Sequence, residues 1–224
     1  MSLTPSLSSA VITLMVIHLL ASMLVAELKN LRAAVWALVA QSLTLCGVIL
    51  LFGRGETWML VWFVWALLTK VVLLPWLFLR SMRSLPPREE EPILGTWLSF
   101  ALVMVSVLVI YRLLHTYLAT LVPTLAAAAE PTRSSLAMAF TIFVLGAYVC
   151  IVRRDLIKVI IGVLLLENGA HLALISLVPA RPETAVIGIL TNVVLSAWLL
   201  LYFGQVIYRV LGTTDTLKLS ELRR

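Results

Sequence analysis

The hydrophobic positions of this chain are grouped in long runs that short polar connections separate. A helix of about 20 apolar residues crosses the roughly 30 Å hydrocarbon core of a bilayer, and a helix satisfies its own backbone there. Seven segments meet this requirement, at about residues 8–26, 33–52, 58–79, 94–114, 134–151, 156–177 and 184–208. The pattern predicts an all-α, polytopic membrane protein in which residues 1–224 form a single transmembrane bundle.

The composition agrees with this class of protein. Hydrophobic residues make up 62% of the chain and charged residues 12%, against about 45–50% and about 25% in soluble domains. The first 20 residues contain no basic segment, so we interpret them as a retained span and not as a signal peptide. Cys46 and Cys150 lie in apolar runs, without the spacing of a disulfide framework or a zinc site.

Two connections are longer than the others. The segment "RSMRSLPPREEEP" clusters prolines and charges, as a solvated loop does. The segment "YLATLVPTLAAAAEPTRSS" is weakly apolar and is broken by Pro123 and Pro131. We expect an interfacial hairpin there and not an eighth span.

Basic residues are distributed unevenly between the two sides of the predicted bundle, with twelve on one side, four on the other and Lys70 within a span. The larger set is Lys29, Arg32, Arg80, Arg83, Arg88, Arg153, Arg154, Lys158, Arg209, Lys218, Arg223 and Arg224, and the smaller set is Arg54, Arg112, Arg133 and Arg181. The positive-inside rule then predicts an outer amino terminus and a cytoplasmic carboxyl terminus. The net charge of +6 follows from this asymmetry and requires no nucleic-acid partner.

Several polar residues fall at similar depth inside the predicted spans. Lys70 lies near the middle of the third span and Glu167 near the middle of the sixth. His171 follows Glu167 by four residues, so the two share one helix face. A secondary set of polar residues at comparable depth consists of Gln41, His18 and Asn192. We expect one polar layer within the membrane.

Lys70, Glu167 and His171 have the chemistry of a proton relay. Charged groups at the bilayer centre cost about 2.5–3.5 kcal/mol on insertion scales, so they are usually paired and are often functional. Burial favours the neutral form of a carboxylate, which lets it exchange a proton near neutral pH, and histidine passes protons readily.

A structural interpretation stays open beside the relay, because a buried lysine–glutamate pair also holds two helices together. For His18 and Gln41 we favour structural hydrogen bonds to neighbouring helices. We interpret Asn168, Gly169 and Gly162 as residues that permit close helix packing. Pro75 follows Lys70 by five residues, so it loosens the backbone hydrogen bonds at that level or kinks the helix.

The stretch "RRDLIKVIIGVLLLENGAHLALI" resembles the K-type (4L) subunit of respiratory complex I and the C subunit of multisubunit cation/proton antiporters. The last three spans, residues 133–210, are similar to that three-helix unit. The glutamate of the K-type unit directly follows a "G-L" step, where this chain has Leu164. Glu167 lies three residues further along, roughly one helical turn away on a similar face.

The whole chain resembles the hydrogenase-4 component E family, through "AQSLTLCG", "LTKVVLLPWL", "LENGAH" and the tail "RVLGTTDTLKLSELRR". That family provides a membrane subunit of formate hydrogenlyase-type assemblies built around group 4 [NiFe] hydrogenases. The resemblance implies that Lys70, Glu167 and His171 are the intramembrane polar residues of the family. The seventh span departs from the pattern, because acidic residues are replaced by residues such as Val186 and Asn192. Asparagine cannot load a proton.

The resemblance implies a non-catalytic, multi-pass subunit in a bacterial or archaeal cell membrane, within a complex I-like hydrogenase. It implies no cofactor in this subunit, with [NiFe] and iron–sulfur clusters in partner subunits. The implied partners are antiporter-like membrane subunits and the hydrogenase module. Two alternatives stay open: a scaffold subunit without its own proton path, and a subunit of a cation/proton antiporter.

Overall fold

Seven helices of the described residues are long and apolar enough to cross a membrane. The computed structural model describes residues 5–52, 57–84, 95–124, 129–177 and 183–216. Its elements are α1 (Pro5–Glu27), α2 (Leu31–Phe52), α3 (Thr57–Ala66), the π-helix η1 (Leu67–Leu73), α4 (Leu74–Met82), α5 (Thr96–Leu121), α7 (Thr132–Val152), α8 (Leu156–Leu177) and α9 (Glu183–Leu211). The segments α3, η1 and α4 together form one span. The all-α, multi-span class predicted from the sequence is confirmed.

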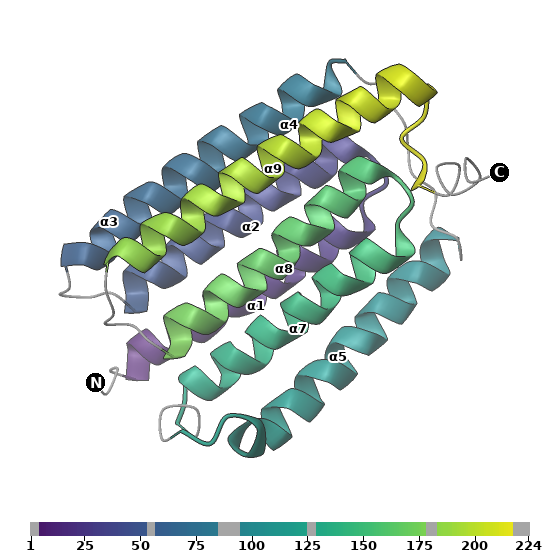
Figure 1. The fold of residues 1–224 in the computed structure, drawn as a ribbon. Coiled ribbons are helices and arrows are strands. Elements are labelled where there is room, and N and C mark those ends of the chain that lie inside the picture. The colour runs from purple at the N-terminus through teal and green to yellow at the C-terminus, as the bar shows by residue number, and fades with distance from the viewer. Residues whose placement is uncertain (1–4, 53–56, 85–94, 125–128, 178–182, 217–224) are drawn as a thin grey trace.

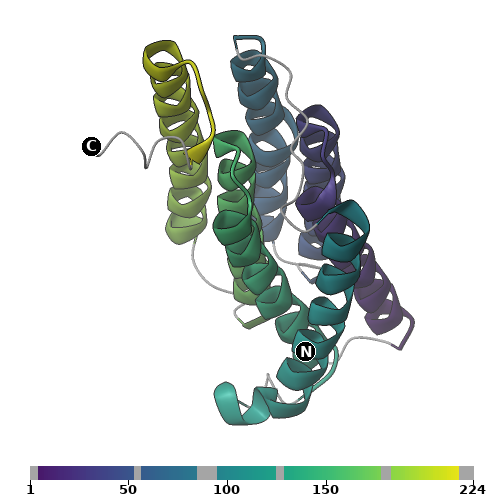
Figure 2. The same cartoon turned by 90° about the vertical axis from the view of Figure 1, so that its right-hand side faces the viewer.

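The helices form two layers (Figure 1). One layer contains α1, α2 and the span made of α3, η1 and α4, and the other contains α7, α8 and α9. Helix α5 lies at one edge, where it contacts both α7 and α1 (Figure 2). Helix α8 is central, since it contacts α7 and α9 in its own layer and α2 and α1 in the other.

Helix α5 is longer than the sequence pattern predicted. It continues to Leu121, beyond the expected end at residue 114, so the expected hairpin is wrong for its first residues. The chain leaves the helix at Val122, because the residue before a proline disfavours helical dihedral angles. Arg112, which the sequence analysis counted among the four basic residues of one side, lies within α5. The central part of the expected hairpin, residues 125–128, lies outside the described residues.

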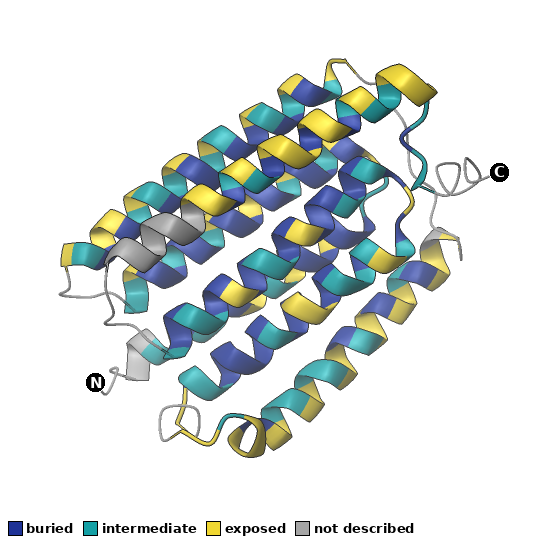
Figure 3. Ribbon diagram, in the orientation of Figure 1, coloured by how far each residue is buried: buried dark blue, intermediate teal, exposed yellow. Residues whose placement is uncertain are grey.

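Burial is greatest where the two layers meet (Figure 3). Within the apolar windows of the spans, 61% of the residues of α8 are buried but only 17% of those of α5. Glycines let α7 and α8 approach closely: a Cβ on Gly146 would lie 2.5 Å from the Leu166 nitrogen, and one on Gly162 would lie 2.9 Å from the Cys150 Sγ. Small residues have this role in membrane helix pairs. The packing role predicted for Gly162 is confirmed.

Buried charges join the helix ends at the side of the bundle where α1 ends and α8 begins. Arg153 pairs with Glu27 at 3.0 Å and donates to the Ala26 carbonyl at 2.8 Å. Lys158 donates to the carbonyls of Val25 and Leu28, each at 2.7 Å. The sequence analysis counted both among the basic residues on one side of the bundle, Arg153 in a connection and Lys158 at the start of the sixth span. Both are buried, because they satisfy carbonyl groups that the end of α1 leaves free.

The turn between α7 and α8 also holds the segment that follows α9. Asp155 accepts a hydrogen bond from the Ile157 N–H at 2.9 Å, which caps α8, and another from the Thr214 hydroxyl at 2.8 Å. The Thr216 N–H donates to the Arg154 carbonyl at 3.0 Å. The outer position of the amino terminus and the cytoplasmic position of the carboxyl terminus stay predictions.

Gly169→Ala is predicted to destabilise the protein by about 1–3 kcal/mol, as overpacking does. Its Cβ would lie 2.7 Å from both the Ala139 carbonyl oxygen and the Phe143 nitrogen, and these backbone atoms cannot rotate away. Thermal unfolding in detergent, followed by tryptophan fluorescence, measures the effect. The matched control is Gly47→Ala, whose Cβ would meet only the Leu14 side chain at 3.1 Å. Equal stability of the two variants would contradict the close backbone contact.

Candidate functional site

Lys70 reaches the interior of the bundle from a π-helical turn. The Leu74 N–H donates to the Thr69 carbonyl, five residues back, as in a π-helix. Pro75 follows and has no N–H to continue the backbone ladder. The loosened backbone that the sequence analysis placed near Lys70 is present as this wider turn. Single π-helical turns inside α-helices are frequent at functional sites.

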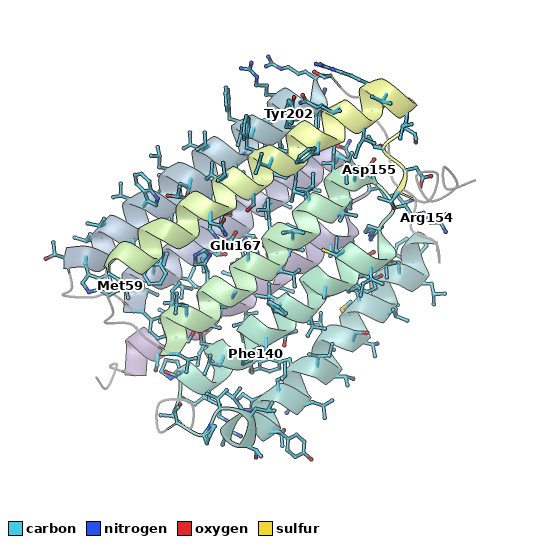
Figure 4. The ribbon with its side chains drawn as sticks, viewed as in Figure 1. Met59, Phe140, Arg154, Asp155, Glu167 and Tyr202 are labelled. Atoms are coloured by element: carbon cyan, nitrogen blue, oxygen red, sulfur yellow. The ribbon has the colours of Figure 1, made fainter. Side chains whose placement is uncertain are left out.

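The Lys70 ammonium lies against titratable side chains of α8. Its Nζ is 3.0 Å from the Glu167 Oε1 and 2.8 Å from the His171 Nδ1. The same Glu167 oxygen is 2.6 Å from the His171 Nδ1. The side chains of Lys70 and His171 are about 1% and 2% exposed, whereas that of Glu167 is 20% exposed. Figure 4 shows Glu167 well along α8, away from Arg154 and Asp155 at one end of the bundle.

These three groups can share protons in more than one way. If Lys70 is an ammonium, it donates to Glu167 and to the lone pair on the His171 Nδ1. If the His171 Nδ1 carries a proton, it donates to Glu167 instead. Both arrangements fit the same heavy-atom positions, since the tautomer of a histidine is not set by those positions. Moving one proton between Lys70 and His171 therefore requires no helix movement.

Amide side chains extend the cluster across the layer interface. Asn168 accepts a hydrogen bond from the Lys70 Nζ through its Oδ1 and donates through its Nδ2 to the Gln41 Oε1 at 2.6 Å. The Gln41 Nε2 donates to the Ser22 hydroxyl at 2.9 Å. The His18 Nδ1 lies 2.9 Å from the Gln41 carbonyl oxygen. One polar chain thus joins α8, η1, α2 and α1.

The structure brings together five of the six residues singled out in the sequence. Lys70, Glu167 and His171 are in contact, and Gln41 and His18 are bonded to each other as expected for neighbouring helices. The interpretation of Asn168 as a residue for close packing is wrong, because its amide joins Lys70 to Gln41 by hydrogen bonds. Its position next to Glu167 is the signal that could have found it.

Asn192 lies apart from this chain of hydrogen bonds as the described residues form it. It is exposed on α9 and, with Glu167 and Ser196, lines a pocket of about 140 Å³ between α8 and α9. The Glu167 Oε2 is buried and has no hydrogen-bond partner among the described residues. Glu167 therefore has one oxygen committed to Lys70 and His171 and a second that is unpaired.

Comparisons with known proteins agree with the sequence resemblances. Residues 134–224, which contain α7 except its first two residues and all of α8 and α9, match the family NADH-ubiquinone/plastoquinone oxidoreductase chain 4L. Hydrogenase-4 component E of Escherichia coli strain K12 is 28% identical over 210 residues, which cover 92% of this chain and 93% of that protein. The chain is a homologue of hydrogenase-4 component E.

Component E of Escherichia coli O157:H7 and that of Shigella flexneri show the same identity to this chain and the same coverage. No solved structure matches the chain. In this chain, Glu167, Asn168 and His171 lie within the segment that matches the 4L family, whereas Lys70 and Gln41 lie before it. Among the described residues, no group of three or more histidine, cysteine, aspartate or glutamate side chains is arranged to hold a metal ion.

Gln41→Leu and Asn168→Leu are each predicted to lower the free energy of unfolding by about 1–3 kcal/mol, since each leaves a buried amide group without its partner. The double variant is predicted to lose less than the sum, with a coupling energy of about 1 kcal/mol. Unfolding in mixed micelles measures the cycle. Gln41→Leu combined with Ser135→Ala is the control, because Ser135 bonds Ser176 in another part of the bundle. Additive losses for Gln41 and Asn168 would contradict the bridge.

Proposed function

We propose that this protein is an integral membrane subunit of a complex I-like hydrogenase assembly and contributes to its proton-translocation path. Similarity to hydrogenase-4 component E and to the 4L chain supports a membrane subunit of such an assembly. The seven spans support a multi-pass protein. Its partners are antiporter-like membrane subunits and a hydrogenase module that carries the [NiFe] and iron–sulfur clusters, in the cell membrane of a bacterium or archaeon.

The observation that carries the proton path is the contact of three titratable side chains at membrane depth. Lys70, Glu167 and His171 lie within 3.0 Å of one another at their nearest polar atoms. A pair that only holds two helices in register needs two opposite charges. A third titratable group beside the pair adds a site to which a proton can move. The contact of Lys70 on η1 with Glu167 and His171 on α8 could not be predicted from the sequence.

Each member of the cluster has a distinct role in the proposed path. Glu167 is the group that loads and releases the proton, and its unpaired Oε2 is the available position for that proton. His171 exchanges a proton with its neighbours through Nδ1. Lys70 sets the charge next to Glu167 and favours the carboxylate when it is itself protonated.

The cluster has different surroundings on its two sides. Toward α9, Glu167 borders the pocket that Asn192 and Ser196 line, where water or a group of a neighbouring subunit can reach the carboxylate. Toward α1, Asn168 and Gln41 keep Lys70 in place by hydrogen bonds, and His18 ends that branch next to Thr44. Asparagine and glutamine hold positions in the chain but do not load protons.

Two other functions make different use of the same residues. In a scaffold subunit the Lys70–Glu167 pair only sets the register of α8 against η1. In a cation/proton antiporter the cluster acts without redox chemistry. A neighbouring gene for a nickel-binding large subunit supports the hydrogenase assembly, and antiporter genes without one support the antiporter.

Glu167→Gln is predicted to lower proton translocation by about tenfold or more, because glutamine keeps a hydrogen bond but cannot carry the proton. Assembly and hydrogenase subunit content stay largely intact. Proton uptake by inverted membrane vesicles during hydrogenase turnover measures translocation, and subunit content is measured in the same vesicles.

The control for this variant is Glu130→Gln. Glu130 precedes α7, is about half exposed and pairs with His115 at 3.0 Å, so its substitution should leave translocation unchanged. Loss of assembly in Glu167→Gln, with normal translocation in the complexes that remain, would support the scaffold function instead.

A further inference from the structure

A groove between α4 and α9 has the features of a lipid headgroup site. It has a volume of about 320 Å³ and lies away from the Lys70 cluster. Ser81 and Leu201 are buried and form its floor, whereas Trp76, Trp198 and Tyr202 are about half exposed and form its walls. Arg80, Leu77 and Gln205 complete the lining.

The polarity of the groove increases toward the carboxyl ends of α4 and α9. Arg80 lies in the last turn of α4, and Arg209 lies in the last turn of α9. Both helices end at the same side of the bundle (Figure 1), and Figure 4 shows Tyr202 on the part of α9 nearer that side. Toward the middle of the membrane the lining is tryptophan and leucine. The polar end thus lies where a span reaches the membrane surface, the level at which tyrosine is enriched.

Arg80 is held in a position to bind an anion. Its guanidinium carbon lies 5.3 Å from the centre of the Trp76 ring, a cation–π contact. A guanidinium stacked on a ring keeps the N–H groups at its edge available for two oxygens of a phosphate. The described lining residues contain no acidic side chain that would repel an anion. Ser81, Tyr202 and Gln205 add hydroxyl and amide groups near the same end.

We propose that this groove binds one anionic phospholipid, with its phosphate on Arg80 and an acyl chain between Trp76 and Trp198. Basic pockets between transmembrane helices recognise acidic headgroups in this way. The apolar inner part of the groove selects a lipid over a free anion, because a free phosphate has nothing to place against the two indole rings. The lipid fills a gap between α4 and α9, which belong to different layers of the bundle.

Native mass spectrometry of the full chain in detergent tests this site. Palmitoyl-oleoyl phosphatidylglycerol and the matching phosphatidylcholine are titrated separately, and the Kd of the first bound lipid is measured for each. The expected result is about fivefold tighter binding of phosphatidylglycerol, and Arg80→Gln is expected to remove that preference. Arg83→Gln is the matched control, since Arg83 follows α4 but does not line the groove.

A second variant keeps the test decisive if Arg80→Gln does not fold. Gln205→Trp fills the groove while Arg80 stays in place, and it is expected to abolish the first binding event for both lipids. Equal affinity of the wild type for the two lipids would overturn the proposal. So would an equal loss in Arg83→Gln, displacement of the lipid by millimolar inorganic phosphate, or binding that persists in Gln205→Trp.

A cross-link in the assembled membrane complex distinguishes a lipid from a protein occupant. A photoreactive benzoylphenylalanine replaces Tyr202, which borders the groove and is exposed in the chain. The expected product has the mass of this subunit plus one phospholipid. A product that contains another protein subunit would assign the groove to a partner and overturn the proposal.

Discussion

Burial of charge where water is scarce is the constraint on which the arrangement of this bundle depends. Lys70 is about 1% exposed, so its ammonium must find acceptors within the protein. Glu167, His171 and Asn168 provide them from α8, which ties that helix to η1 through side-chain contacts. The two layers are thereby held at a defined register by polar contacts, while apolar side chains fill the remaining space.

The same rule operates at the end of the bundle, with different partners. Arg153 and Lys158 are buried against the carboxyl end of α1, where backbone carbonyls are free to accept hydrogen bonds. Favourable interaction of cations with a helix carboxyl terminus adds to this arrangement. One set of charges therefore secures helix ends, and the set around Glu167 brings three titratable side chains into contact. That difference separates a purely structural cluster from one suited to proton exchange.

The sequence predicted the features that hydrophobic runs determine and missed those that depend on contacts between helices. The seven spans and the common depth of Lys70, Glu167 and His171 follow from apolar length and helical spacing. Whether Lys70 touches Glu167 depends on how the third and sixth spans pack, and that order is absent from any single run of residues. Asn168 was misread for this reason, because an amide is a link only when donors and acceptors face it. The extent of α5 was underestimated because weakly apolar residues before Pro123 still favour helix.

The π-helical turn at Leu67–Leu73 has a geometric consequence for the third span. A π turn contains one residue more than an α turn, so it shifts the sequence positions that share a helix face by one residue, about 100° of α-helical rotation, between its two halves. Trp62 before the turn and Phe78 after it are both buried. Deleting a single residue within the turn would let it close as an ordinary α turn and leave both halves of the span facing the same neighbours. The extra residue therefore changes the direction of the side chains within the turn, and not the direction in which the two halves face.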